Sequence, residues 1–419
     1  MFEEKVVCSV SSLPVDGIIN DCCYKIEQHS PNEYTHNYFK YPCKFIPEIP
    51  RWAIKKYSNL NDFVFDPFAG SGTTVLEAKI LGRNSFYTEI DEVAKLLIST
   101  KTTQLTQEQQ KKATDFLDII SVPANNAKEY VPQIKNLEHW FSNEVVSALS
   151  NIRAHIDSIC DISLKNFLLV CLASIIKKVS NADSVSPKPY VSAKVKKQIY
   201  NANDEYRSTV KKYLEGMNLF SQLELPSTCE LASGDALSFV LPRKIKLAIT
   251  SPPYINAFDY ARTMRLENIW LGLQNEESLL LKKREYVGTE QVKPTYQIPF
   301  DSQANKLESL KLLVSKIKEK DKKRAVVVEK FFYDMEKNIK SVSESLEENG
   351  VYVIVIGNSV IRGVNIESWK YLMEIAKNYS LDFELHFEYL IQNPYIRIPR
   401  GEKSKAIKTD HILVLRKRG

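Results

Sequence analysis

The sequence predicts an α/β protein in which one mostly parallel sheet carries a largely helical insertion. Two observations support this prediction. Apolar, strand-like stretches alternate with amphipathic ones on both sides of the middle of the chain, as expected for strands joined by crossover helices. Between about 104 and 226 the alternation gives way to long helical patterns, such as DISLKNFLLVCLASIIKKV, and to a connection rich in Pro, Ser and Lys. The predicted domains are therefore 1–103 with 227–419, and the inserted lobe 104–226.

The individual elements follow from hydrophobic periodicity and from turn residues. After Asn61, the run DFVFDPFAGSGTTVLEAKILG predicts a strand, a glycine turn and an amphipathic helix that ends at Gly82. NSFYTEID predicts a second strand, which leads into a helix near Val93 to Thr100. Beyond the insertion, strands are predicted in CELASGDA, IKLAITSPPY and VYVIVIGNSV. The last two strands, DFELHFEYLI and DHILVLRKR, have no helix between them, which predicts an antiparallel pair at the edge of the sheet.

The composition is that of an ordinary soluble protein, with 44% hydrophobic and 26% charged residues. Lys and Arg exceed Asp and Glu by 57 to 51, which suits a polyanionic partner and equally suits a solvated surface. The seven cysteines show no zinc or redox spacing, so no metal is expected. The absence of a leader segment and of an apolar run of membrane-spanning length predicts a cytoplasmic protein without a membrane partner.

The strongest chemical signal is the turn DPFAGSGTT, in which Gly70 and Gly72 stand between a strand and a helix. Without side chains there, the backbone can approach a ligand and present N–H groups at the positive end of the helix. A nucleoside triphosphate would require a lysine after the second glycine, but Thr73 occupies that position. The carboxylate of the methionine moiety of S-adenosylmethionine fits instead. We expect Asp66, Gly70 and Gly72 to hold this end of the cofactor.

Acidic residues also follow the next two core strands. Glu89 comes about twenty residues after the glycine turn, the spacing at which a carboxylate accepts hydrogen bonds from ribose hydroxyls. Asp235, in SGDA, is placed to accept from an adenine amino group. Taken singly, each is equally well explained as a surface carboxylate. Because ligands of open sheets bind at the carboxyl ends of the strands, Asp66, Glu89 and Asp235 together favour a cofactor site.

The tetrapeptide Ser251-Pro252-Pro253-Tyr254 directly follows the apolar strand IKLAIT. The lone pair of an aromatic amine is delocalised into its ring, so the nitrogen becomes nucleophilic only when its N–H groups find hydrogen-bond acceptors. The Ser251 hydroxyl and the Pro252 carbonyl offer two such acceptors, and the prolines stiffen the turn that aims them. Tyr254 offers a flat face for a base swung out of a duplex, a stacking interaction of about 1–3 kcal/mol.

These residues resemble the amino-methyltransferases of DNA, which modify N4 of cytosine or N6 of adenine. DPFAGSGTT is similar to motif I of that family and SPPY to motif IV. The segment from Tyr41 to Phe45, with Pro47, resembles motif X, whose helix packs over the methionine end of the cofactor. The resemblance covers 36–100 and 228–415. It implies a Rossmann-like fold that depends on S-adenosylmethionine, with a mostly parallel seven-stranded sheet and an antiparallel edge strand.

The order of the motifs also resembles a subclass in which the target-recognition region lies between motifs I and IV. On this basis the inserted lobe would recognise double-stranded DNA, and a second insertion at about 275–345 is the other candidate. The predicted catalytic residues are Ser251, Pro252, Pro253 and Tyr254. The predicted cofactor-binding residues are Tyr41, Lys44, Phe45, Asp66, Pro67, Phe68, Gly70, Ser71, Gly72, Thr73, Thr74, Glu89, Ile90, Asp235 and Ala236. The predicted DNA-binding residues are Lys188, Lys194, Lys196, Lys197 and Arg262, although a solvated helix face would also explain the lysines.

A serine before Pro-Pro is commoner in the cytosine-N4 enzymes of this family, so the resemblance favours N4 of cytosine and leaves N6 of adenine as the alternative. A cytosine-C5 enzyme would need a nucleophilic cysteine, but Pro42-Cys43 precedes motif I, where a structural cysteine is expected. An RNA base methyltransferase and a non-catalytic DNA-binding subunit also remain open. No nuclease cluster is found, so a cognate restriction endonuclease would be a separate partner.

Overall fold

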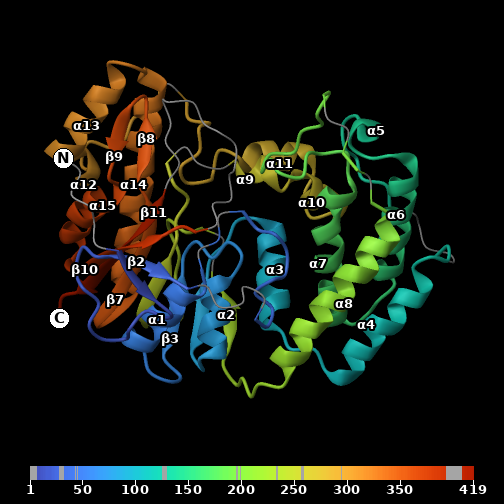
Figure 1. Ribbon diagram of the computed structural model, residues 1–419. Helices are drawn as coiled ribbons and strands as arrows, with labels where there is room; N and C mark the ends of the chain where they lie inside the picture. Colours follow the sequence, from blue (N-terminus) through green and yellow to red (C-terminus); the bar gives the residue numbers. More distant parts are fainter. Residues whose placement is uncertain are drawn as a thin grey trace.

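The computed structural model describes residues 7–27, 33–42, 44, 46–124, 130–194, 197–198, 200–232, 235–255, 259–293, 295–392 and 408–419. Its central feature is a nine-stranded mixed sheet with the order β1-β2-β10-β11-β7-β6-β3-β4-β5. In Figure 1 this sheet lies on one side of the molecule and the long helices of the middle of the chain lie on the other.

Five strands form the parallel half of the sheet. Each of them overlaps a stretch that the sequence predicts as a strand. They are β3 (Phe63–Asp66), β4 (Asn84–Tyr87), β5 (Cys229–Leu231), β6 (Ile245–Thr250) and β7 (Leu346–Gly357). The pairs β7/β6, β6/β3, β3/β4 and β4/β5 are parallel. Because these strands point the same way, the glycine turn after β3 and the SPPY segment after β6 leave the sheet at the same edge.

The remaining strands of the sheet correct the predicted topology. They are β1 (Val7–Val10), β2 (Cys23–Ile26), β10 (Leu381–Leu390) and β11 (Thr409–Lys417). β11 runs antiparallel to both β7 and β10, so it lies inside the sheet, where β10, β2 and β1 extend it further. The prediction of seven strands with the antiparallel strand at the edge is therefore wrong. The four-residue sequences VCSV (β1) and CYKI (β2) are too short for their hydrophobic periodicity to predict two further strands.

Both faces of the sheet are covered, and the alternation along β7 shows how. Val351, Val353 and Val355 pack on one side in a cluster with α1 (Glu48–Tyr57), the helix expected from the motif X segment. Tyr352 and Ile354 pack on the other side. That second cluster includes α13 (Glu308–Lys318), α14 (Lys322–Ser345) and α15 (Ser368–Ala376). Side chains that alternate along a strand point to opposite faces, so the sheet is the middle layer of a three-layer arrangement.

The middle of the chain is helical as predicted. Within its described residues it forms α4 (Gln107–Ile119), α5 (Leu137–Trp140), α6 (Asn143–Asp157), α7 (Ile162–Val179) and α8 (Ala202–Ser221). The apolar helix α7 is the centre of this group and contacts α3 (Glu92–Thr102), α6, α8 and α10 (Arg265–Trp270). Figure 1 shows α3 between the sheet and these helices. None of the described helices is long and apolar enough to span a lipid bilayer.

One hydrophobic cluster unites α4, α6, α7 and α8 with α3 and with the chain that follows SPPY. That chain contributes α9 (Tyr260–Thr263), α10 and α11 (Glu276–Lys282). Phe141 of the helical lobe packs edge-on against Trp270 of α10, with 5.5 Å between the ring centroids. The helical lobe and the segment after SPPY therefore share one core.

Candidate active site

A cavity with about 780 Å³ of empty space, part of it open to solvent, lies at the carboxyl edge of β3, β4 and β6. It gathers residues from every motif that the sequence predicts to contact the cofactor, and from the segment after SPPY. The lining residues are Tyr41, Pro42, Lys44, Pro67, Phe68, Ala69, Gly70, Ser71, Thr73, Thr88, Glu89, Ile90, Asp235, Ala236, Leu237, Ser251, Pro253, Tyr260, Glu285, Tyr286 and Val287.

Most of the predicted cofactor and catalytic residues line this cavity. Those that do not line it are Asp66, Gly72, Thr74, Pro252 and Tyr254. Phe45 lies outside the described residues. The stretch 285–287, which does line the cavity, is not predicted as part of the site. The neighbouring Gly288 is the one local sequence signal there, because a glycine often marks a place where the backbone packs closely against another segment.

The two glycines of the turn are required for different reasons. Both have left-handed backbone conformations, with φ of 50° at Gly70 and 75° at Gly72. A Cβ on Gly70 would lie 3.3 Å from Cε1 of Tyr41, in the wall of the cavity. A Cβ on Gly72 would lie 2.9 Å from Cγ1 of Ile98 on α3. Gly70 therefore keeps space at the ligand side, whereas Gly72 allows helix α2 (Thr73–Ile80) to start close against α3.

Asp66 lies beneath the turn and connects two loops. It is buried, and its Oδ1 accepts hydrogen bonds from Thr250 Oγ1 at 2.7 Å and from Phe68 N at 3.0 Å. Burial raises the pKa of Asp66 to about 6. Since Thr250 is the last residue of β6, directly before Ser251, this carboxyl group fixes the glycine turn relative to SPPY.

Glu89 connects the turn after β3 to the turn after β4. Its Oε2 accepts from Gly70 N at 2.7 Å, and its Oε1 accepts from Ile90 N and Asp91 N, both at 2.8 Å. Burial, together with the charge of Asp91, raises the pKa of Glu89 to about 7, although these N–H donors oppose the shift. Glu89, which the sequence predicts to bind ribose, lines the cavity.

Two ammonium groups lie near the glycine turn. Lys44 lines the cavity and donates to the His36 carbonyl at 3.0 Å, and Lys101, which is buried, donates to the Ser71 carbonyl at 2.9 Å. Desolvation lowers the pKa of Lys44, and it lowers that of Lys101 strongly, with a smaller contribution from the charge of Lys44. Each of these bonds goes to a carbonyl, and burial disfavours the charged form of both side chains, so an anionic ligand beside them would favour their protonation.

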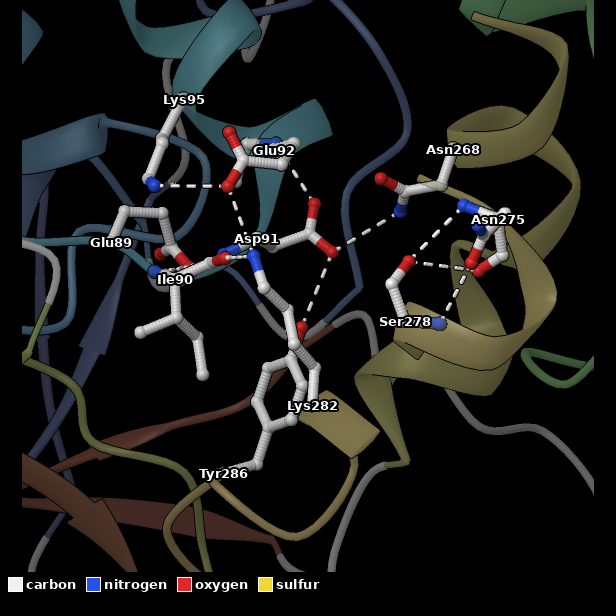
Figure 2. A network of polar contacts seen from close by, with 11 residues as sticks. Glu89, Ile90, Asp91, Glu92, Lys95, Asn268, Asn275, Ser278, Lys282 and Tyr286 are labelled. Carbon is white, nitrogen blue, oxygen red and sulfur yellow. Dashed lines mark hydrogen bonds and ion pairs between the residues drawn. The ribbon is translucent and has the colours of Figure 1, made fainter. Parts of the chain in front are cut away.

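The segment after SPPY is anchored to the turn after β4 by a polar network (Figure 2). Asp91 Oδ2 accepts from Asn268 Nδ2 of α10 and from the Tyr286 hydroxyl, each at 3.3 Å. Lys282 Nζ donates to the Ile90 carbonyl at 2.8 Å. These contacts bring Tyr286 into the cavity wall beside Ile90, although the two residues are far apart in the sequence.

Three tyrosines stack along one wall. The ring centroids of Tyr41 and Tyr260 are 6.1 Å apart at 22°, and those of Tyr260 and Tyr286 are 5.8 Å apart at 18°. Burial raises the pKa of Tyr41 and that of Tyr286 well above the usual value, so both stay neutral. The wall is flat and aromatic, and it comes from three separate segments.

The SPPY segment faces the cavity through Ser251 and Pro253. Tyr254 does not line the cavity, and its hydroxyl donates a hydrogen bond to Asp410 Oδ1 of β11 at 2.6 Å. Asp410 is buried, and its Oδ2 accepts from the Tyr389 hydroxyl at 2.9 Å. A Cβ on Gly288 would lie 2.6 Å from the Tyr254 carbonyl oxygen, so the chain after Val287 packs directly on this segment.

The predicted DNA-binding residues have different surroundings. Lys188, Lys194 and Arg262 are exposed. Lys197 donates to the carbonyls of Lys177 and Ser180 at 2.8 and 2.9 Å, so its ammonium group caps the end of α7. Burial lowers the pKa of Lys197 to about 8. Lys196 lies outside the described residues.

Comparisons with known proteins agree with these motifs. Residues 17–100 match a family model described as DNA methylase, N6_N4_Mtase. The chain is 25% identical over 417 residues to the type II methyltransferase M.MvaI of Kocuria varians, covering 92% of this chain and 91% of the relative. It is 26% identical over 290 residues to the type II methyltransferase M.BsoBI of Geobacillus stearothermophilus, covering 62% of this chain and 57% of the relative.

Among solved structures, an rRNA methyltransferase from Streptomyces viridochromogenes aligns with 93% of this chain and 94% of its own, at 8% identity and a TM-score of 0.32. A similarity at that level carries no argument about substrate. The matched family model and the type II relatives together support the DNA amino-methyltransferase family for this chain.

Proposed function

We propose that the protein is a site-specific DNA methyltransferase that transfers a methyl group from S-adenosylmethionine to the exocyclic amino group of a base, with N4 of cytosine as the target. The observation that supports this most directly is the shared cavity. Gly70 of the glycine turn and Ser251 of SPPY line the same space, although they belong to separate halves of the sequence. A methyl donor and an amino acceptor must meet in one such space.

The residues of the cavity fit S-adenosylmethionine in charge and in chemistry. A methionine carboxylate beside Gly70 and Ser71 would favour the protonated forms of Lys44 and of the buried Lys101, which would then attract it. Glu89 is placed to accept hydrogen bonds from ribose hydroxyls. When bound, the cofactor supplies an electrophilic methyl group on a sulfonium ion.

The adenine end would lie on the side of the cavity formed by Ile90, Asp235 and Ala236. Asp235 is exposed, and its Oδ1 accepts from Leu237 N at 2.8 Å. The Ala236 carbonyl accepts from Asn338 Nδ2 of α14 at 2.7 Å, which fixes this short loop against the helix behind it. Asp235 is thus held in place to accept from an amino group.

Ser251 and the Pro252 carbonyl would accept hydrogen bonds from the amino group of the flipped base, which localises the nitrogen lone pair for attack on the methyl carbon. The serine at the first position supports cytosine over adenine, as in the resembling enzymes. The hydroxyl of Tyr254 is held by Asp410, and its ring would stack on the base. The helical lobe, which shares its core with the segment after SPPY, would carry the DNA-recognition surface.

The test is methyl transfer from labelled S-adenosylmethionine to defined duplexes, followed by digestion to nucleosides and mass spectrometry. We expect N4-methylcytosine, and we expect the variant Ser251→Ala to lose most of the transfer while still binding the cofactor. The exposed Ser315→Ala on α13 is the matched control and should behave like the parent protein. N6-methyladenine alone would refute the choice of base, and methylated RNA with unmodified DNA would refute the substrate class. DNA binding without any transfer would indicate a non-catalytic subunit.

A further inference from the structure

A second group of chemically active side chains lies outside the cavity, between β10 and β11. His386 and Glu388 are two residues apart on β10 and therefore share a face of the sheet. His411 of β11 stands opposite Glu388 in the antiparallel register. All three are buried, with 2%, 3% and 4% of their surface exposed. Three potential ligands of a transition metal thus converge in the interior, on two neighbouring antiparallel strands.

The distances within this cluster are close to those of a metal site. His386 Nε2 and His411 Nδ1 are 3.0 Å apart, and His411 Nδ1 is 3.6 Å from Glu388 Oε1. One ligand atom from each residue lies within 4.8 Å of the others. Tetrahedral zinc, with bonds of about 2.0–2.2 Å to nitrogen and oxygen, separates its ligand atoms by roughly 3.3 Å. Only small side-chain shifts would be needed to seat an ion among the three groups.

The surroundings of His386 have the pattern that orients metal-bound imidazoles. Its Nδ1 is 2.6 Å from Asp21 Oδ1, in the connection between β1 and β2, and Asp21 N donates to the His386 carbonyl at 2.7 Å. A carboxylate on Nδ1 keeps the proton there and leaves the Nε2 lone pair directed at the cluster. The ring of Trp369 stacks on His386 at 3.8 Å and 9°, which fixes the plane of the imidazole.

The charges also match a dication. Two neutral imidazoles with the carboxylates of Asp21 and Glu388 sum to a charge of −2. A buried carboxylate is costly unless a positive charge or strong donors compensate it. A divalent ion held by one ligand atom of each of the three residues would carry charge opposite to that of the Glu388 carboxylate.

We propose that His386, Glu388 and His411 bind one divalent transition-metal ion of the zinc class, with Asp21 as the carboxylate that orients His386. The site is structural: it joins β10 to β11 and, through Asp21, to the connection before β2. It also fixes the start of β11, where Asp410 holds Tyr254. The proposal stands independently of the methyltransferase reaction.

The experiment uses the full chain without a histidine tag, because a tag would bind metal itself. The protein is stripped with a chelator and titrated with Zn²⁺ and Co²⁺, and bound metal is measured by mass spectrometry. We expect one equivalent of metal, visible Co²⁺ bands of a four-coordinate site made of two nitrogens, the Glu388 oxygen and one water, and a rise in melting temperature on adding metal. Asp21→Asn should weaken the affinity about 10- to 100-fold.

His411→Gln should abolish binding, whereas His139→Gln, at an exposed position in α5, should leave it unchanged. The thiols of Cys8 and Cys22 are 3.2 Å apart and are the competing ligands, so a thiolate charge-transfer band with Co²⁺ would overturn the assignment. Binding of less than about a tenth of an equivalent would also overturn it, and would leave a hydrogen-bonded chain from Asp21 through His386 to His411. If His411→Gln fails to fold, the Co²⁺ spectrum of the parent protein still decides between the two ligand sets.

Discussion

The hydrogen bond from Tyr254 to Asp410 links the SPPY segment, which follows β6, to β11, the second strand away in the sheet, and it allows a quantitative prediction. Replacing Tyr254 with Phe keeps the ring and removes only the hydroxyl that donates to Asp410 Oδ1 at 2.6 Å. If this bond holds the aromatic face in position for the flipped base, the variant should lose methyl transfer while its affinity for S-adenosylmethionine stays unchanged. The cofactor affinity is spared because Tyr254 does not line the cavity.

The scale of the effect follows from the burial of the acceptor. A hydrogen bond to a charged group contributes about 1.5–3 kcal/mol. Since about 1.4 kcal/mol corresponds to a factor of ten in rate, complete use of this bond for positioning would lower kcat about 10- to 150-fold. Asp410 would keep its other donor, the Tyr389 hydroxyl at 2.9 Å, so the carboxylate is not left without a partner. The variant should therefore remain folded.

The assay is single-turnover methyl transfer to a duplex, together with calorimetric titration of the cofactor. Tyr389→Phe is the matched control, because it removes the other bond to the same carboxylate and leaves Tyr254 tethered; its kcat should fall much less. In an Asp410→Asn background, Tyr254→Phe should cost less than it does in the parent protein, since part of the interaction is already lost. An equal cost in both backgrounds would refute the positioning role, and so would parallel losses of transfer and cofactor binding.

Three further predictions concern the cavity. The raised pKa of Glu89 means that its protonated form stabilises the fold below about pH 4.5, and that this contribution is lost as the pH rises through about 7. Cofactor affinity should change in the opposite sense and increase towards pH 8, with a midpoint near 7. In Glu89→Gln, calorimetry should show a cofactor affinity that is weaker and does not depend on pH. Gly72→Ala should lower the free energy of unfolding, measured in urea, more than Gly363→Ala does. Both glycines have positive φ, but only at Gly72 would the added Cβ meet a side chain, that of Ile98 at 2.9 Å. Lys101→Met should raise the melting temperature, because it removes a buried amine, and it should weaken cofactor binding. An unchanged dissociation constant for the cofactor would show that Lys101 does not attract the methionine carboxylate.

The predicted elements that proved correct are those whose signals are local. The run around Gly70 becomes β3, the turn and α2, and NSFYTEID becomes β4 followed by α3. Both require only a strand, a break and a helix in succession. The sequence does not predict β1 and β2, because a strand of four residues is stabilised mainly by its neighbours, here β10 beside β2.

The site residues also fall into a group that the sequence predicts and a group that it does not. The sequence predicts Gly70 and Ser251 as site residues because each belongs to a contiguous motif, DPFAGSGTT or SPPY. Tyr286 and Glu285 were not, because they reach the cavity only through contacts such as Tyr286 to Asp91, which no local pattern encodes. Lys197 is the opposite case. The basic stretch around it predicts a DNA contact, but its ammonium group donates to carbonyls at the end of α7.

Local sequence patterns suffice to predict the β-α-β core, the glycine turn and the SPPY segment, because strands, turns and helix starts depend on neighbouring residues, on the backbone freedom of glycine and on the restricted backbone of proline. Three features become visible only in the folded chain: β11 lies inside the sheet, the Tyr254 hydroxyl donates to Asp410, and two histidines and a glutamate meet between β10 and β11. Those features join residues up to 156 positions apart. Their partners are chosen by strand pairing and by the packing of helices on the sheet, which short-range sequence patterns do not specify.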